Sequence, residues 1–228
     1  TIKPLVDELF QRNLIEAWFF IRYKDQENHI RFRLRLLNVI DFQEVVFLVN
    51  NMFKQHLVNG FIWNIVISTY YRELSKYGSS SIELSESFFY HDSEEVLKII
   101  KLSQGDENKK LLLIYNRIEK ILHYFKLTDK EKLSFLDKMQ LAFKNELKVD
   151  SGKKRVLSKK YRFFEKDLTN FPVYKTDNLS EIVDEILLLK KLNLLEIEIE
   201  DLLASFIHMF INRCFQSNQR TFEMIVYD

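Results

Sequence analysis

The sequence contains a single cysteine, Cys214, which excludes an internal disulfide and any cysteine-rich zinc site. Glycine and proline are also rare, with 4 and 2 copies, so we expect no linker, no low-complexity segment and little disorder. No apolar run reaches the roughly 18 residues of a membrane span, and no signal peptide is visible. Together these absences predict one compact domain that is soluble and cytoplasmic.

A strong net charge is absent as well, because 34 basic and 33 acidic residues leave a formal charge of +1. Such a chain has no global field that attracts nucleic acid or an anionic membrane. We therefore expect no direct nucleic-acid binding, and any anion site must be local. The histidines lack the spacing of metal ligands, and no glycine-rich phosphate loop is present. We predict no metal and no organic cofactor.

The composition favours a real core, since 46% of the residues are hydrophobic and 20 are Phe. The periodicity predicts an α+β fold, with a strand-rich N-terminal third and a mostly helical remainder. In the first third we expect a helix over Pro4–Ile15 and then a β-hairpin of strands Ala17–Tyr23 and His29–Leu37 with a five-residue loop. A second helix is predicted over Asp41–Gln55, with Asp41 as its N-cap and a break at Gly60. A third strand is predicted over Phe61–Tyr70. Further helices are predicted over Asp92–Leu102 with an N-terminus at Asp92, Leu111–Lys126, Thr128–Leu147, Leu179–Lys190 and Ile197–Phe215, with a basic loop at Ser151–Arg155 and a strand or helix end at Thr221–Tyr227.

The most informative stretch is the predicted second strand. Side chains alternate along a strand, so His29, Arg31, Arg33 and Arg35 fall on one face. Arginine is the best side chain for forked recognition of a carboxylate or phosphate. An exposed strand face paired with surface acids would give the same pattern. The spacing alone leaves an anion site and a solvated face both open.

Two other clusters carry polar groups in apolar surroundings. One runs from Tyr70 to Gly78 and contains Arg72, Glu73 and Lys76, where a polar turn with surface ion pairs is the alternative. The other is His208-Met-Phe-Ile-Asn-Arg213, in which His208 and Asn212 share a helix face. A histidine on an apolar helix is often a core residue with satisfied hydrogen bonds, so that alternative also stays open.

Taken in order along the chain, these clusters resemble the C-terminal elimination domain of lantibiotic dehydratases, which is also found in thiopeptide-type biosynthesis proteins. The matching blocks are Trp18-Phe-Phe-Ile-Arg-Tyr23 with His29-Ile-Arg-Phe-Arg33, Tyr70-Tyr-Arg-Glu73 with Lys76-Tyr-Gly78, Glu86-Ser-Phe-Phe with Asp92-Ser93, and His208-Met-Phe-Ile-Asn-Arg213 with Glu223 as the acid that follows. The resemblance covers nearly the whole chain. It implies one elimination-type domain over residues 1–228 that lacks its first strand, either as a trimmed domain or as a piece of a longer dehydratase.

The resemblance implies a lyase that removes glutamate from glutamylated Ser or Thr of a precursor peptide by β-elimination, leaving dehydroalanine or dehydrobutyrine. Arg31, Arg33, Lys76 and His208 are the implied catalytic residues. Arg31 and Arg33 would bind the glutamyl adduct and stabilise developing charge, and His208 would transfer a proton or orient glutamate. Glu73, Arg72, Asn212 and Arg213 are the implied substrate-binding residues, and Arg35 has a supporting role.

The implied partners are the glutamylated precursor peptide, a glutamylation domain or subunit that uses glutamyl-tRNA, and a lanthionine cyclase; self-association into a homodimer is left open. Two departures from the family pattern stand out. Lys76 replaces an arginine and cannot make a forked contact, and Gly78-Ser79 replaces a Gly-Gly pair. A non-catalytic peptide-binding scaffold and a pyridine-forming cycloaddition enzyme of the same fold are the alternative functions.

Overall fold

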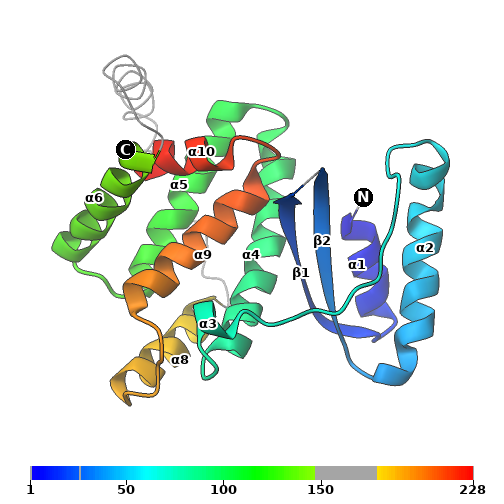
Figure 1. The fold of residues 1–228 in the computed structure, drawn as a ribbon, viewed down its shortest axis with the longest axis horizontal. Coiled ribbons are helices and arrows are strands. Elements are labelled where there is room, and N and C mark those ends of the chain that lie inside the picture. The colour runs from blue at the N-terminus through cyan, green and yellow to red at the C-terminus, as the bar shows by residue number, and fades with distance from the viewer. Residues whose placement is uncertain (1, 26, 147–178, 228) are drawn as a thin grey trace. The chain divides into compact units, whose positions relative to one another are not determined.

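The structure is a computed structural model that describes residues 2–25, 27–146 and 179–227 (Figure 1). Its internal contacts divide the chain into two compact units, Thr1–Arg72 and Glu73–Asp228. The single domain expected over residues 1–228 stays a prediction. The basic loop expected at Ser151–Arg155, and Leu147 at the end of a predicted helix, lie outside the described residues.

The first unit combines helices with a β-hairpin, as the sequence predicts. Its elements are α1 (Ile2–Gln11), β1 (Ile15–Lys24), β2 (Asn28–Leu36), the short 3₁₀ helix η1 (Val39–Asp41) and α2 (Phe42–Val58). Asp41 occupies the predicted N-cap position of α2, although its side chain makes no capping hydrogen bond. Gly60 follows the helix with a positive φ of 71°, which glycine adopts without steric cost. The expected break is therefore present.

The hairpin has a defined register that fixes the two faces of the sheet. Strands β1 and β2 pair antiparallel, with Phe19 opposite Arg33 and Ile21 opposite Arg31. Lys24 pairs with Asn28, so the strands extend further toward the turn than predicted. Trp18 and Phe20 are buried on the opposite face, and the Trp18 ring also contacts Phe32 on β2. The alternation of His29 to Leu36 thus gives one apolar face and one basic face.

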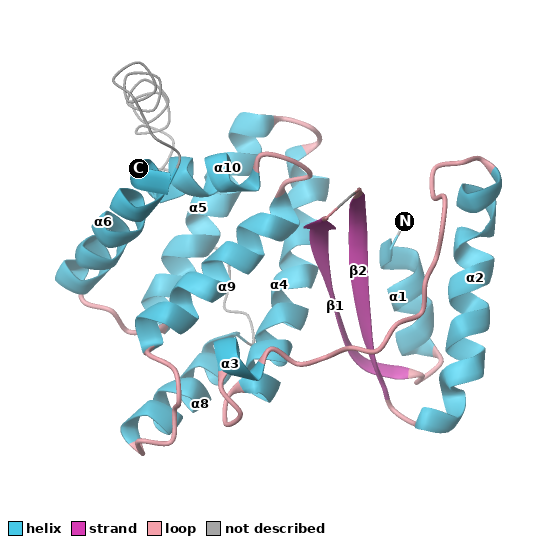
Figure 2. Ribbon diagram, in the orientation of Figure 1, coloured by secondary structure: helices cyan, strands magenta, loops and turns pink. Residues whose placement is uncertain are grey.

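The third strand expected over residues 61–70 does not form. Within the described residues the sheet has two strands, and the stretch 61–73 has no regular secondary structure (Figure 2). An isolated extended segment gains no ladder of backbone hydrogen bonds. Phe61 and Trp63 are accordingly 80% and 76% exposed. The Ile, Val and aromatic residues of this segment favour a strand, but a strand also needs a neighbouring strand to pair with, and the described residues offer none here.

The described residues of the second unit form helices joined by turns and loops, with no strand among them. Its elements are α3 (Leu74–Tyr77), α4 (Ile82–Ser103), α5 (Glu107–Tyr124), α6 (Asp129–Glu146), α8 (Leu179–Lys191), α9 (Ile199–Cys214) and α10 (Gln219–Tyr227). The start of α6 is a capping box, because the Glu131 carboxylate accepts from the Thr128 N–H and the Thr128 hydroxyl accepts from the Glu131 N–H. The segment Thr221–Tyr227, expected as a strand or a helix end, belongs to helix α10. The predicted α+β class is confirmed.

Helix α4 begins ten residues before the predicted start, at Ile82. Asp92 was expected to cap a helix, yet it lies in the middle of α4 and is fully buried. Its carboxylate faces Arg117 of α5 and Arg213 of α9 instead. The sequence pattern of an oxygen-bearing residue before two acids is the same in both situations. The sequence pattern therefore predicted a helix cap where the structure has a buried ion pair.

The core of this unit is an aromatic cluster centred on Phe206 of α9. The Phe206 ring stacks on Phe88 at 4.0 Å between centroids, and it contacts Phe89, Phe125 and Tyr77 at longer distances. Tyr77 belongs to α3, so the cluster ties α3 and α4 to α9. Because Phe206 is fully buried, one face of α9 is fixed. His208, two residues later, is held by the same helix.

Candidate functional site

On the basic face of β2, Arg31 and Arg33 are half-buried. The Arg31 guanidinium lies 3.5 Å from the centre of the Tyr23 ring, and its Nε donates to His29 at 3.3 Å. Stacking on an aromatic ring is worth about 0.5–2 kcal/mol and orients the guanidinium. Arg31 is therefore held in a defined position rather than extended into bulk water.

Arg33 has the most constrained environment of the strand. Its guanidinium lies 5.0 Å from the centre of the Tyr70 ring, and Tyr70 also packs against Phe19. The buried Nε of Arg33 has no hydrogen-bond partner among the described residues. Burial, and next the like charge of Arg31, lower the pKa of Arg33, whereas Tyr70 raises it. Both effects that lower the pKa oppose the cationic form, so a bound anion would stabilise the pair.

Arg35 behaves differently from the two arginines before it. Its Nε lies 2.5 Å from Glu16, and both side chains are about half exposed. An exposed pair of this kind contributes about 0–1 kcal/mol. The supporting role expected for Arg35 fits this position. The strand thus divides into Arg35, which is paired with a carboxylate, and an inner pair in which Arg31 contacts His29 and the Nε of Arg33 has no hydrogen-bond partner among the described residues.

The second predicted block begins the helical unit. Lys76 lies at the end of α3, with its ammonium 5.3 Å from the centre of the Tyr77 ring. Glu73 precedes α3 and is exposed, and its carbonyl accepts hydrogen bonds from the N–H groups of Lys76 and Tyr77. Arg72 is exposed at the end of the first unit. The Glu73 backbone therefore shapes the turn that presents Lys76.

Ser79, which departs from the family pattern, has a structural function in this turn. Its N–H donates to Glu196 at 2.6 Å, and its hydroxyl donates to the same carboxylate. These bonds lower the pKa of Glu196, the hydroxyl contributing more than the N–H. A Cβ at Gly78 would lie 3.3 Å from the Glu196 carboxylate, and Gly78 has a φ of +74°. Gly78 is thus required on steric and conformational grounds, whereas the serine adds a contact.

His208 is paired with a buried carboxylate. Its Nδ1 lies 2.9 Å from Oε2 of Glu223 on α10; the His208 side chain is 31% exposed and Glu223 is 1% exposed. At this distance Nδ1–H donates to the carboxylate, which leaves Nε2 as the nitrogen that can accept a proton. Asn212 lies one helical turn later and is half-buried. The imidazole is therefore oriented and accessible rather than sealed in the core.

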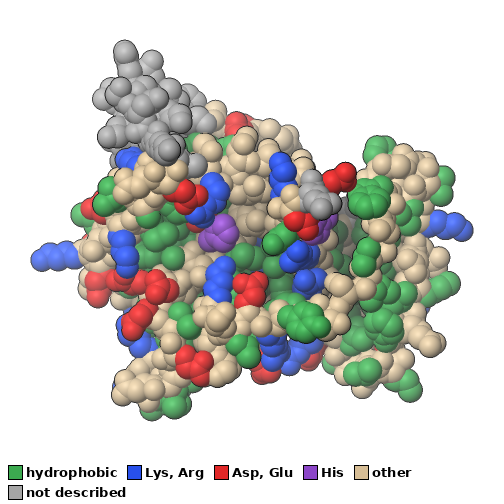
Figure 3. Space-filling view, viewed as in Figure 1, with side chains coloured by type: hydrophobic (Ala, Val, Ile, Leu, Met, Phe, Trp, Pro, Cys, Tyr) green, Lys and Arg blue, Asp and Glu red, His purple; other side chains and the backbone are tan. Residues whose placement is uncertain are grey.

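Sequence reasoning missed two residues of the His208 cluster, Arg220 and Glu146. Arg220 lies 3.3 Å from Glu223 and 3.5 Å from His208 Nδ1, and it also pairs with Glu146 at the end of α6. The i,i+3 spacing of Arg220 and Glu223 was a weak signal, and nothing in the sequence placed Glu146 beside them. Figure 3 shows histidine, basic and acidic side chains gathered on the face formed by α6, α9 and α10.

Arg213 is buried completely and belongs to a charged cluster in the core. Its Nη1 lies 3.5 Å from Asp92, and Arg117 approaches the other oxygen of Asp92 at the same distance. Burial raises the pKa of Asp92 to about 6, although Arg117 and Arg213 both lower it. The cluster joins α4, α5 and α9, and α9 also carries His208. Substrate binding by Arg213 stays a prediction.

The structure thus brings the predicted residues together in two groups. Arg31 and Arg33 share a face of the hairpin in the first unit, and His208 and Glu223 form a pair in the second. A common cleft for the hairpin arginines, Lys76 and His208 spans both units and stays a prediction.

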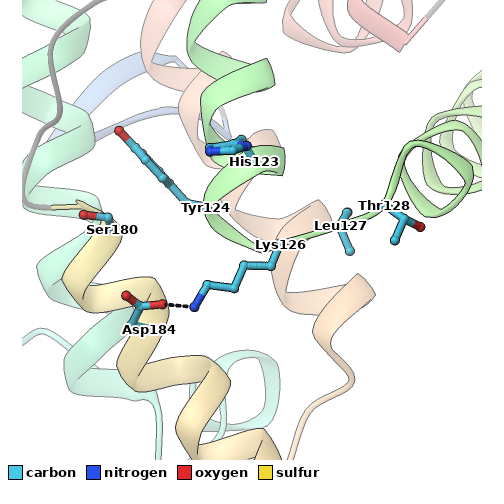
Figure 4. Close-up of a pocket in the computed structure, with 7 residues that line it drawn as sticks. All are labelled: His123, Tyr124, Lys126, Leu127, Thr128, Ser180 and Asp184. Atoms are coloured by element: carbon cyan, nitrogen blue, oxygen red, sulfur yellow. Dashed lines mark ion pairs between the residues drawn. The ribbon is translucent and has the colours of Figure 1, made fainter.

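A surface hollow of about 430 Å³ lies elsewhere, at the junction of α5 and α8, and none of the predicted site residues lines it. Its lining residues are His123, Tyr124, Lys126, Leu127, Thr128, Ser180 and Asp184. Figure 4 shows Lys126 and Asp184 pairing across it, at 2.6 Å. Both side chains are mostly exposed. The histidine and lysine of the hollow lie outside the predicted site blocks, and Lys126 is already paired with Asp184.

The described part of the chain offers no metal centre, since no group of three or more His, Cys, Asp or Glu residues in it could hold an ion. Within the same residues, every helix is too short or too polar to cross a membrane.

Two characterised proteins are similar in sequence. The chain is 26% identical over 224 residues to the epidermin biosynthesis protein EpiB of Staphylococcus epidermidis, an alignment that covers 94% of this chain and 22% of EpiB. It is 30% identical over 138 residues to the subtilin biosynthesis protein SpaB of Bacillus subtilis, covering 58% of this chain and 13% of SpaB. The chain therefore spans a small part of the length of either relative.

Two solved structures share the fold. The tRNA-dependent lantibiotic dehydratase MibB from Microbispora sp. 107891 superposes with a TM-score of 0.60 at 15% identity, over 100% of this chain and 25% of that one. TsrL superposes with a TM-score of 0.64 at 12% identity, over 99% of this chain and 86% of that one. The family model for the C-terminal region of lantibiotic biosynthesis dehydratases matches residues 1–228. The chain belongs to the lantibiotic biosynthesis dehydratase C-terminal family.

Proposed function

We propose that this chain is a lyase that eliminates glutamate from glutamylated Ser or Thr residues of a ribosomal precursor peptide. The observation that carries the proposal is the Arg31–Arg33 pair, in which a buried guanidinium nitrogen of Arg33 has no partner among the described residues. The departing group of the reaction is a carboxylate, which such a pair recognises well. Membership of the dehydratase family supports the choice of a glutamyl ester as the substrate.

The proposed reaction breaks two bonds and forms one double bond. A base removes the Cα proton of the esterified residue, the Cβ–O bond breaks, and glutamate leaves as its carboxylate while dehydroalanine or dehydrobutyrine forms. Arg31 and Arg33 stabilise the charge that develops on the leaving oxygens. His208, oriented by Glu223, transfers a proton through Nε2. Lys76 supplies a further positive charge.

The proposed setting follows from the same chemistry. A glutamylation domain or subunit that uses glutamyl-tRNA supplies the ester, and a lanthionine cyclase consumes the dehydrated residues in lanthipeptide biosynthesis. Thiopeptide assembly uses dehydrated residues as well. We propose that the reaction takes place in the cytoplasm, where aminoacyl-tRNA is made.

The test supplies a peptide that carries a glutamylated serine and follows its mass with time. Wild type should yield a product lighter than the unesterified peptide by one water. Arg33→Ala and His208→Ala should lose the reaction while retaining the fold. Arg12→Ala is the matched control, because Arg12 is an exposed arginine paired with Glu8 and Glu44. Binding of the ester without turnover by the wild type would sink the lyase proposal and favour a peptide-binding scaffold.

A further inference from the structure

The Arg220–Glu146 contact has the geometry of a carboxylate-binding site. Arg220 Nε donates to one oxygen of Glu146 at 3.0 Å, and Nη2 donates to the other at 2.5 Å. This is the forked arrangement in which arginine recognises a carboxylate most specifically. The Phe143 ring lies 4.4 Å from the guanidinium carbon and restricts its plane. The guanidinium is therefore preorganised for a planar anion.

The same guanidinium reaches the proposed proton-transfer group. Its Nη1 lies 3.3 Å from Glu223 and 3.5 Å from Nδ1 of His208. Arg220 thus connects the buried Glu223 and the partly exposed His208 on one side with the exposed Glu146 on the other. A carboxylate bound on the Glu146 side would lie beside the imidazole.

The Glu146 contact is also readily exchanged. The side chains of Arg220 and Glu146 are both 46% exposed, in contrast to Glu223. Solvent reaches both side chains, so an incoming carboxylate that offers the same two oxygens can take the place of Glu146 in the forked contact. Glu146 itself ends in the same propionate group as a glutamyl residue. The molecule therefore already shows how Arg220 holds a glutamate side chain.

A glutamyl ester always keeps one ionised carboxylate, because glutamate has two carboxyl groups and the ester uses one. We propose that Arg220 is the subsite for this free carboxylate, and that Glu146 occupies it until the substrate arrives. The inference rests on the proposed elimination and deepens it, since it makes Arg220 the residue that distinguishes a glutamyl ester from other esters.

The test compares two esters of one serine peptide, a glutamyl ester and a glutaminyl ester, in which an amide replaces the free carboxylate. Wild type should favour the glutamyl ester in kcat/KM, and Arg220→Gln should reduce that preference about tenfold by losing charge-assisted hydrogen bonds. Glu146→Gln should lower KM for the glutamyl ester alone. Lys138→Gln is the control, because Lys138 of α6 forms an exposed ion pair with Glu200 of α9 and is not part of the His208 cluster.

An Arg220→Gln variant that slows both esters equally, or keeps the wild-type preference, would overturn the subsite. A second measurement separates this outcome from failure of the elimination itself. Peptides in which a nitrogen replaces the ester oxygen bind without turnover, and their affinity is measured by calorimetry. Wild type should bind the glutamyl analogue more tightly than the glutaminyl analogue, and Arg220→Gln should bind both alike. This pattern without elimination would support the subsite and reject the lyase.

Discussion

Asp92 should make the stability of the chain depend on pH in an unusual direction. Burial raises its pKa from the usual 3.8 to about 6 in the folded chain, against the lowering effect of Arg117 and Arg213. The folded state therefore binds the Asp92 proton more tightly than the unfolded state does. The stability that this group contributes is fully present below about pH 4 and is lost as the pH rises through about 6.

The size of the effect follows from the pKa. Each tenfold change in proton affinity corresponds to about 1.4 kcal/mol, so the rise of the pKa to about 6 is worth about 3 kcal/mol. Other carboxyl groups titrate in the same range, so the measured quantity is the difference between wild type and Asp92→Asn. Between pH 4 and 7, wild type should lose roughly 3 kcal/mol relative to that variant.

Urea unfolding followed by circular dichroism at several pH values between roughly 4 and 7 measures this difference. Ser93→Ala is the matched control, because Ser93 is a buried neighbour on α4 that donates to the Phe89 carbonyl and does not titrate. Its difference from wild type should stay constant with pH. If the Asp92→Asn difference is equally constant, the reasoning about Asp92 is refuted.

Three further predictions concern packing, charge geometry and the outer strand. Phe206→Ala should lower the free energy of unfolding by about 3–5 kcal/mol in a urea titration, whereas Leu141→Ala, at a 61% exposed position, should change it by less than about 1 kcal/mol; similar losses would contradict the assigned core. Lys76→Arg should raise kcat/KM for a glutamylated peptide several-fold, because a guanidinium can fork onto a carboxylate; a slower variant would argue against an anion contact there. Arg35→Gln should change stability by less than about 1 kcal/mol and leave elimination unchanged, since its partner Glu16 is exposed; loss of elimination would place Arg35 in the site.

The parts of the fold that the sequence predicted are those governed by local periodicity. The alternation of His29 to Leu36 predicted β2, and helical spacing predicted α5, α6, α8 and α9 to within a few residues. The errors have tertiary causes. Residues 61–70 read as a strand but lack a pairing strand among the described residues, and Asp92 read as a cap but pairs with arginines from other helices.

The candidate site was predictable only in part for the same reason. His208 and Glu223 were both singled out, and they form a pair. Arg220 and Glu146 were missed, because their relation to His208 depends on how α10 packs against both α6 and α9. No spacing in the sequence links residues 146 and 220. The contact between Arg33 and Tyr70 was not predicted either, because Tyr70 lies in a segment that was expected to form a strand.

The most direct test of the central claim uses a glutamylated serine peptide that carries deuterium at the serine Cα. Elimination predicts that wild type releases glutamate, loses the deuterium and leaves a peptide lighter than the unesterified deuterated peptide by one HDO, and that Arg33→Ala and His208→Ala do not. Release of glutamate with the deuterium retained and the serine mass restored would show hydrolysis of the ester, and it would contradict the account.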